Sequence, residues 1–375
     1  CLGCDKLATF IIKKSKIIFW IILGIIAFLI SGLFSIELND NFIKYFSKHY
    51  EIRRASDFME ENLTGLDIID YSLESGEASG INNPEYLNKI EEFANWYRTQ
   101  PKVVHVNVIT DIIKRLNKNM HQDDPKYYRI PENRELAAQY LLLYEMSLPF
   151  GLNLNNQINV DKSSTRMTAT LKKTSAKEQR DLDTKAREWL KNNAPESMFT
   201  YGSGLSIMWS HISKRNINSM LGASLGALIL ISIILIFALR SLKIGVISLI
   251  PNLTPTFMAF GIWGMTIGQV GLGLSVIIAM TLGIVVDDTI HFLSKYLRAR
   301  REHNLNSQES VRYAFNTVGT AMWITTVALV AGFLVLATSN FKMTSDMGLM
   351  TAITISLALV MDFLLLPTLL MKMEA

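Results

Sequence analysis

The feature that most limits the possible folds is residues 244–286, which contain no Asp, Glu, Lys or Arg. A helix needs about 20 apolar residues to cross the bilayer core, which is about 30 Å thick. At about 1.5 Å per residue the stretch is too long for a single crossing. We therefore expect two membrane helices that meet near Gly268 and Gly271. Of the 375 residues, 49% are hydrophobic and only 19% are charged, and the mean hydropathy is +0.23. This balance is too apolar for an ordinary soluble enzyme of this size.

Further apolar segments bring the expected number of membrane spans to six. The expected spans are residues 17–36, 216–239, 244–267, 270–293, 313–341 and 345–371. The rest of the chain is expected to form a cytoplasmic segment at residues 1–16, an extracytoplasmic domain at 37–215 and a basic cytoplasmic loop at 294–312. The last five spans form a bundle within residues 216–372, so the pattern is one span, a large domain and five spans.

The expected orientation follows from the basic residues of the short loops. They gather on the side that holds the N-terminus, namely Lys6, Lys13, Lys14, Lys16, Arg240, Lys243, Lys295, Arg298, Arg300, Arg301, Arg312 and Lys372. Cytoplasmic loops carry the excess of Lys and Arg. We therefore expect a multi-pass protein of the bacterial inner membrane, with a cytoplasmic N-terminus and an extracytoplasmic large domain.

The large domain alternates short apolar runs with helical stretches, which favours an α+β fold. The expected elements are strands 66–73, 103–109, 164–171 and 198–201, a helix that begins at Pro84, a helix at 176–191 and an inserted helix at 133–148. Two strand–helix–strand units of this kind predict ferredoxin-like βαβ units.

Enzyme signatures are missing from the sequence. It has no phosphate-binding glycine loop, no HExxH and no GxSxG, which are the motifs of nucleotide, metalloprotease and hydrolase sites. Cys1 and Cys4 are too few ligands for a zinc site. We expect no enzymatic activity, no cofactor and no metal, and the net charge of +4 indicates no nucleic-acid partner.

Two adjacent carboxylates, Asp287 and Asp288, lie in the expected fourth span. A charged side chain at mid-membrane costs about 2.5–3.5 kcal/mol on insertion scales. A pair kept from water can hold a proton and release it when water or a cation arrives. The alternative is a structural pair that is hydrogen-bonded to neighbouring helices or hydrated near the interface.

Other polar residues could complete a proton relay with this pair. His291 lies one turn further along, where it either extends the relay or ends the helix, and Asp362 interrupts the sixth span. The predicted relay is thus Asp287, Asp288, His291 and Asp362. The predicted supporting hydroxyls are Thr289, Thr325, Thr326 and Thr354.

Three stretches carry a family resemblance: residues 248–255, 283–296 and 358–367. With the one-plus-five span pattern, they resemble half of a transporter of the resistance–nodulation–division (RND) superfamily. The membrane part looks most like the branch of predicted hydrophobe exporters related to the "mycobacterial membrane protein large" family and to sterol-sensing-domain proteins. The large domain is then expected to be a porter-type domain.

The resemblance implies transport of lipids or other hydrophobic compounds driven by the proton-motive force, with Asp287 and Asp288 at the proton-relay position. The implied partners are membrane lipids, a hydrophobic substrate, the other half of the transporter and periplasmic proteins. Related exporters hold two halves in one chain. Because this sequence holds one half and does not begin with Met, we expect the C-terminal half of a longer transporter.

Two other functions remain open. The same helices could form a non-transporting lipid sensor or scaffold. An intramembrane aspartyl protease is disfavoured because such enzymes place their two aspartates on different helices, whereas Asp287 and Asp288 are adjacent on one.

Overall fold

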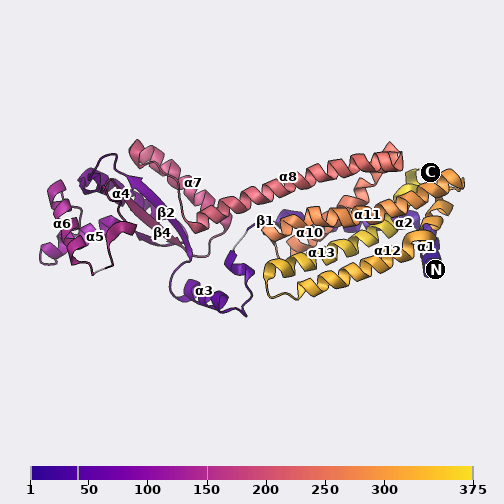
Figure 1. Cartoon of the computed structure of the whole chain (residues 1–375), viewed down its shortest axis with the longest axis horizontal. Coiled ribbons are helices and arrows are strands. Elements are labelled where there is room, and N and C mark those ends of the chain that lie inside the picture. Colours follow the sequence, from indigo (N-terminus) through magenta and orange to yellow (C-terminus); the bar gives the residue numbers. More distant parts are fainter. Residues whose placement is uncertain (1, 40–41, 150, 374–375) are drawn as a thin grey trace. The chain divides into compact units, whose positions relative to one another are not determined.

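The computed structural model describes residues 2–39, 42–149 and 151–373. The chain divides into two compact units (Figure 1). The helical unit comprises Cys1–His49 and Ser213–Ala375, and the α/β unit comprises Tyr50–Ile212.

The helical unit consists almost entirely of long apolar helices. Its elements are α1 (Leu2–Lys13), α2 (Ser15–Ser31), η1 (Gly32–Ser35), η2 (Phe42–Tyr45), α8 (Leu205–Leu239, from Ser213 on), α9 (Leu242–Ile247), α10 (Leu249–Thr266), α11 (Leu272–Glu302), α12 (Ser307–Ala337), α13 (Lys342–Val360), the π-helix η7 (Met361–Leu365) and α14 (Leu366–Met373). Six helical segments of the described chain are long and apolar enough to cross a membrane: Ser15–Ser35, Leu205–Leu239, Leu242–Thr266, Leu272–Glu302, Ser307–Ala337 and Lys342–Met373. The protein is therefore an α-helical membrane protein.

The bundle has a buried centre and an apolar periphery. The most apolar windows of the segments Leu242–Thr266 and Lys342–Met373 are each 61% buried, against 11% for Ser307–Ala337. α13 contacts α10, α11 and α12, and these four helices run alongside one another in Figure 1. Gly261 of α10 packs against the backbone of Leu29, and this close approach of two backbones requires a small residue.

The helices differ in their bounds from the expected spans. The expected loop 294–312 is mostly helical, because α11 continues to Glu302 and α12 begins at Ser307. A search for uncharged stretches stops at the first charge, whereas Arg and Glu are good helix formers. The span expected at 244–267 is divided at Ser248 into α9 and α10, and α8 begins well before residue 216.

A short parallel ribbon, which the sequence analysis does not predict, lies at one end of the bundle. β1 (Glu37–Leu38) pairs with β5 (Gln269–Val270), with Glu37 opposite Gln269 and Leu38 opposite Val270. β5 occupies the Gly268–Gly271 break between two helices, where Gly268 has a positive φ of 75°.

The α/β unit is built on a three-stranded antiparallel sheet in the order β2-β4-β3. Its elements are α3 (Glu51–Asn62), β2 (Asp67–Glu74), η3 (Gly80–Asn82), α4 (Pro84–Arg98), β3 (Val103–Asn107), α5 (Ile109–Met120), η4 (Pro125–Tyr127), α6 (Arg134–Ser147), η5 (Leu154–Asn156), β4 (Ser164–Leu171), α7 (Ala176–Asn193), η6 (Glu196–Met198) and the start of α8. Alternate residues of β2 and β4 are buried, among them Tyr71 and Met167. This period of two shows that one face of the sheet covers the core.

The prediction of a strand at residues 198–201 is wrong. The chain there forms η6, and the edge of β2 gains only an isolated bridge between Asp70 and Ser203. The backbone N–H of Gly202 donates to the carboxylate of Asp183 instead of to a strand, and Gly204 has a φ of 109°. Helix α5, which the sequence analysis did not predict, follows directly after β3.

Candidate functional site

The predicted aspartate pair lies on the outer face of the bundle. Asp287 and Asp288 of α11 line a groove of about 920 Å³ between α11 and α12, together with Gly283, Ile284, His291, Val318, Ala321, Met322, Thr325, Ala328 and Leu329. The side chain of Asp287 is 73% exposed, and its Oδ1 lies 3.6 Å from Nε2 of His291. Asp288 is half-buried. The helices of this chain therefore shield Asp288 in part and leave Asp287 open.

Asp362 occupies a different environment, in the core of the bundle. Its side chain is fully buried, and its Oδ1 accepts a hydrogen bond of 2.8 Å from the hydroxyl of Thr289. Its other carboxylate oxygen has no hydrogen-bond partner in the described structure. A buried carboxylate that lacks partners costs several kcal/mol when charged, so this position suits a group that binds a proton.

The backbone around Asp362 is a π-helix, η7, between α13 and α14. A π turn adds one residue to the helical repeat and is frequent at functional sites. η7 contacts α11, and within it Asp362 meets Thr289. The distortion thus falls at the residue whose side chain bridges the two helices.

Asp288 and Thr289 are neighbours on α11, and each faces one of the two environments. Successive residues of a helix point in different directions. Asp288 borders the groove while Thr289 points into the core, and the carboxylates of Asp288 and Asp362 interact electrostatically. The hydroxyl of Thr289 bonds to Asp362, whereas no hydrogen bond of the described structure joins Asp288 to Thr289, so the groove and the core are adjacent on α11 without a continuous hydrogen-bonded path.

The remaining predicted hydroxyls are not assembled around Asp362 by any hydrogen bond of the described structure. Thr325 lines the groove, and its hydroxyl bonds to carbonyls of its own helix. Thr354 is buried and donates to the carbonyl of Met350 at 2.8 Å. The hydroxyl of Thr326 is buried without a partner.

Two further polar residues of the bundle, Asn252 and Asp346, are not among the predicted site residues. Asn252 of α10 is 1% exposed, and neither atom of its amide group has a hydrogen-bond partner among the described residues. A search for charged residues does not detect it, although an Asn beside Pro251 in an apolar span is a recognisable signal. Asp346 lies within the expected sixth span, one turn after Lys342.

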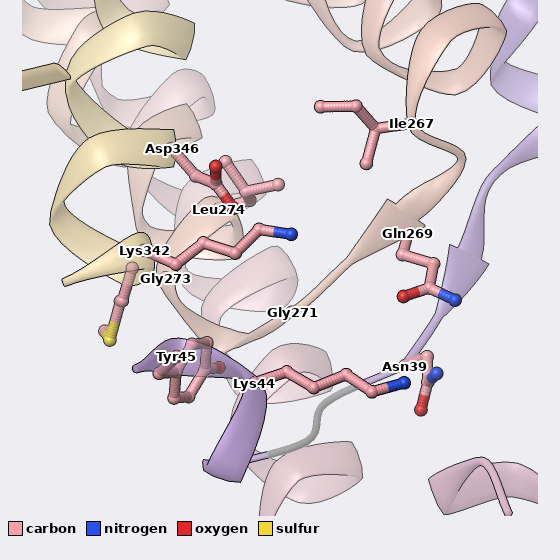
Figure 2. Close-up of a pocket in the computed structure, with 11 residues that line it drawn as sticks. Asn39, Lys44, Tyr45, Ile267, Gln269, Gly271, Gly273, Leu274, Lys342 and Asp346 are labelled. Carbon is pink, nitrogen blue, oxygen red and sulfur yellow. The ribbon is translucent and has the colours of Figure 1, made fainter. Parts of the chain in front are cut away.

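Asp346 and Lys342 belong to a second, polar pocket of about 70 Å³. Figure 2 shows Lys342 and Asp346 of α13, Gln269 of β5 and Asn39 around this space, with Lys44 of η2 extending toward Asn39. The described residues contain no cluster of three His, Cys, Asp or Glu side chains suited to a metal ion.

Comparison with known proteins identifies the family of the chain. The sequence pattern of the MMPL family matches residues 154–373, which include α8 to α14 and the end of the α/β unit. A curated membrane protein of Methanocaldococcus jannaschii is 30% identical over 147 residues, and this match covers 39% of the chain and 38% of that relative. The match thus spans less than two fifths of either protein. The chain belongs to the MMPL family of transporters, within the RND superfamily.

Proposed function

We propose that the protein is a secondary transporter of the RND type that uses the proton-motive force to move lipids or other hydrophobic compounds. The observation that carries this proposal is the hydrogen bond between Thr289 and the fully buried Asp362, next to a groove that contains Asp287 and Asp288. In this proposal a proton enters the groove, binds first at Asp288 and reaches Asp362 after a movement of the side chains that brings Asp288 to the hydroxyl of Thr289.

Protonation of Asp362 changes the packing preference of the bundle because the neutral acid is stable in the core and the carboxylate is not. A proton that crosses 100 mV releases about 2.3 kcal/mol. At about 1.4 kcal/mol for each factor of ten, this energy shifts a two-state equilibrium roughly 50-fold. The π-helix η7 is the segment that we expect to change, since its backbone departs from the α-helical pattern beside Asp362.

The groove requires a cover if it lies within a bilayer. The exposed Asp287 and His291 would otherwise face lipid, where charged groups are costly. We propose that a second MMPL bundle, from the same longer chain or from a second subunit, packs over α11 and α12 and encloses the pair.

The proposed topology places the N-terminus and the ends of α8, α11 and α14 in the cytoplasm, and the α/β unit outside it as a porter-type domain. The Lys and Arg residues at those ends, such as Arg240, Arg301 and Lys372, support this orientation by the positive-inside rule.

A vesicle assay tests the function. The full protein is reconstituted with a pH-sensitive dye inside and a fluorescent fatty acid as the hydrophobic probe, and a pH gradient is imposed. We expect probe movement that depends on the gradient and that Asp288→Asn abolishes, while the matched Asp346→Asn variant, which removes a carboxylate outside the groove, retains it. A lipid sensor or scaffold would show no gradient-driven movement above that of protein-free vesicles, and that result would contradict the proposal.

A further inference from the structure

Helix α3 (Glu51–Asn62) carries its apolar and its charged residues on opposite faces. At 3.6 residues per turn, Ile52, Ala55, Met59 and the following Leu63 fall within about 80° of one another, and we call this set the apolar face of α3. The charged residues of the other side are Arg53, Arg54, Asp57, Glu60 and Glu61. A helix with such a stripe ordinarily buries it against the core of its own domain.

The apolar face of α3 is instead uncovered. Ile52 is 60% and Leu63 69% exposed, and none of the residues 51–62, all of which the structure describes, is buried. On the charged side, Glu60 is half-buried, and its carboxylate accepts a hydrogen bond of 3.0 Å from the backbone N–H of Lys173. The helix is thus attached to the α/β unit through its charged side, which is the reverse of ordinary packing.

A short connection joins α3 to one end of the membrane bundle. Within the helical unit, the backbone N–H of Ser47 donates to the carbonyl of Asn340 at 3.2 Å, between α12 and α13. Glu51 follows Ser47 by four residues, which span at most about 14 Å. The chain itself therefore holds the start of α3 within about 14 Å of this end of the bundle, which is the extracytoplasmic end in the proposed topology.

The segment before α3 has aromatic residues typical of a membrane–water interface. The ring centroids of Phe42 and Tyr45 lie 6.3 Å apart, and the ring of Phe46 lies 5.7 Å from that of Phe341. Tyr50 directly precedes the helix. Because aromatic residues, Tyr above all, are enriched at the level of the lipid headgroups, this composition indicates that the connection runs at that level.

We propose that the apolar face of α3 lies in the outer interface of the bilayer and anchors the α/β unit to the outer leaflet. Interfacial helices bury their apolar face about 5–10 Å into the boundary between headgroups and acyl chains, while their charged face stays in water. α3 carries four acidic and two basic residues, so apolar burial holds it rather than attraction to anionic lipids. The short connection raises its effective concentration at the membrane, so a weak intrinsic affinity is sufficient.

A protein partner suits this face less well than a bilayer. The helix has 12 residues, so its apolar face is about 18 Å long and about 10 Å wide. A stable protein interface buries about 800 Å² on each partner, which is several times this area. The inference goes beyond the proposed function and requires only that the helical unit spans the bilayer.

Spin labels on the full protein in phosphatidylcholine nanodiscs test the site. Cys1 and Cys4 are replaced by Ser, and single labels are introduced through Ala55→Cys, Met59→Cys and Glu61→Cys. We expect the labels at residues 55 and 59 to collide with oxygen more than with a water-soluble nickel complex, and the label at residue 61 to show the reverse. Equal access of the nickel complex to all three labels would overturn the proposal. Protection of residues 55 and 59 from both reagents would show a protein cover, such as a second copy, and would overturn it as well.

Charged substitutions separate membrane contact from folding. In Ile52→Glu/Met59→Glu, the label of Ala55→Cys should move into water, because burial of each apolar side chain contributes roughly a factor of ten and the ratio of bound to free helix falls roughly 100-fold. The matched control is Leu142→Glu/Met146→Glu, which adds two charges to exposed apolar residues of α6 and should leave the label in the bilayer. Hydrogen exchange of β2 and β4 should equal that of wild type in both variants. Retained lipid contact in Ile52→Glu/Met59→Glu would contradict the inference.

Two further measurements separate this inference from the proposed function and from electrostatic attachment. Asp288→Asn should abolish gradient-driven movement and leave the labels in the bilayer, so labels in water on a protein that transports would overturn the membrane contact alone. Salt at about 1 M screens charges within about 3 Å and should leave an apolar contact unchanged. Detachment of α3 at that salt concentration would contradict the apolar basis of the anchor.

Discussion

Buried carboxylates differ in their hydrogen bonding between the two units of the molecule. In the α/β unit, Asp183 is 2% exposed and its carboxylate accepts from Tyr71, Gly202 and Arg187. In the helical unit, Asp362 is fully buried and accepts from Thr289. Its second oxygen and the whole amide group of Asn252 lack hydrogen-bond partners among the described residues.

Two buried amides of the α/β unit, those of Asn82 and Gln179, combine an unpaired oxygen with a bonded nitrogen in the described structure. The nitrogens donate to Ser79 and Thr174. A satisfied polar network holds a single structure. Unsatisfied groups in an apolar bundle are costly and need a reason, and in the proposed function that reason is the movement of protons and lipid.

The largest effect is expected at Asp362. In Asp362→Asn the side chain keeps its shape and loses its ionisable group, so gradient-driven probe movement should fall to that of protein-free vesicles. The midpoint of thermal unfolding should change by less than about 2–4 °C, which corresponds to about 1 kcal/mol. Transport by Asp362→Asn at close to the wild-type rate would show that the incompletely bonded carboxylate of the helical unit is not functional.

For Asp183 we expect a loss of stability. In Asp183→Ala the donors on Tyr71, Gly202 and Arg187 are left without their acceptor, and removal of one partner from a buried charged network costs about 3–5 kcal/mol. Hydrogen exchange of the full protein, followed by mass spectrometry on peptides from α7, measures this loss. Unchanged protection of α7 would show that the network is not structural.

A smaller effect on the transport rate is expected to distinguish two threonines, Thr289 and Thr325. Thr289→Val removes the hydroxyl that bonds to Asp362, so the rate of gradient-driven movement should fall while some remains through water. Thr325→Val is the matched control, because that hydroxyl bonds within its own helix, and its rate should match wild type. Equal rates in both variants would remove Thr289 from the proton path.

The smallest effect is a pH dependence of the α/β unit. Burial acts to raise the pKa of Glu91, but hydrogen bonds from Lys114 and Thr110 outweigh it and hold the pKa below its ordinary value. Stability from Glu91 is therefore complete above the unfolded pKa of about 4.3 and is lost as the pH falls through the lower folded pKa. Urea unfolding at a series of acidic pH values should show this loss, and Glu91→Gln should flatten it. An unchanged slope in Glu91→Gln would assign the acid loss to other groups.

Much of the architecture could be predicted from the sequence because helices in a membrane leave a strong local signal. Uncharged stretches indicated six apolar segments, and the alternation of Ser164 to Leu171 predicted β4 with the observed bounds. The family resemblance is confirmed by the match to residues 154–373. The absence of a strand at residues 198–201 could not be predicted from the local sequence. It depends on the carboxylate of Asp183, distant in the sequence, which accepts a hydrogen bond from the N–H of Gly202.

The candidate site was only partly predictable, because some of its contacts join residues that are far apart in the sequence. Asp287, Asp288 and His291 share one face of α11 through their spacing, and the groove contains all three. The bond between Thr289 and Asp362 joins residues far apart in the sequence, and the π-helix that accompanies it has no signal in residues 361–365.

The most direct test of the proton path is infrared difference spectroscopy on the reconstituted protein while the pH gradient is reversed. A protonated carboxylic acid has a C=O stretching band that a carboxylate lacks. The account predicts a band that appears and disappears with the direction of the gradient, shifts in Thr289→Val and loses the component of Asp362 in Asp362→Asn. A band that persists unchanged in Asp362→Asn would contradict the claim that Asp362 carries the proton.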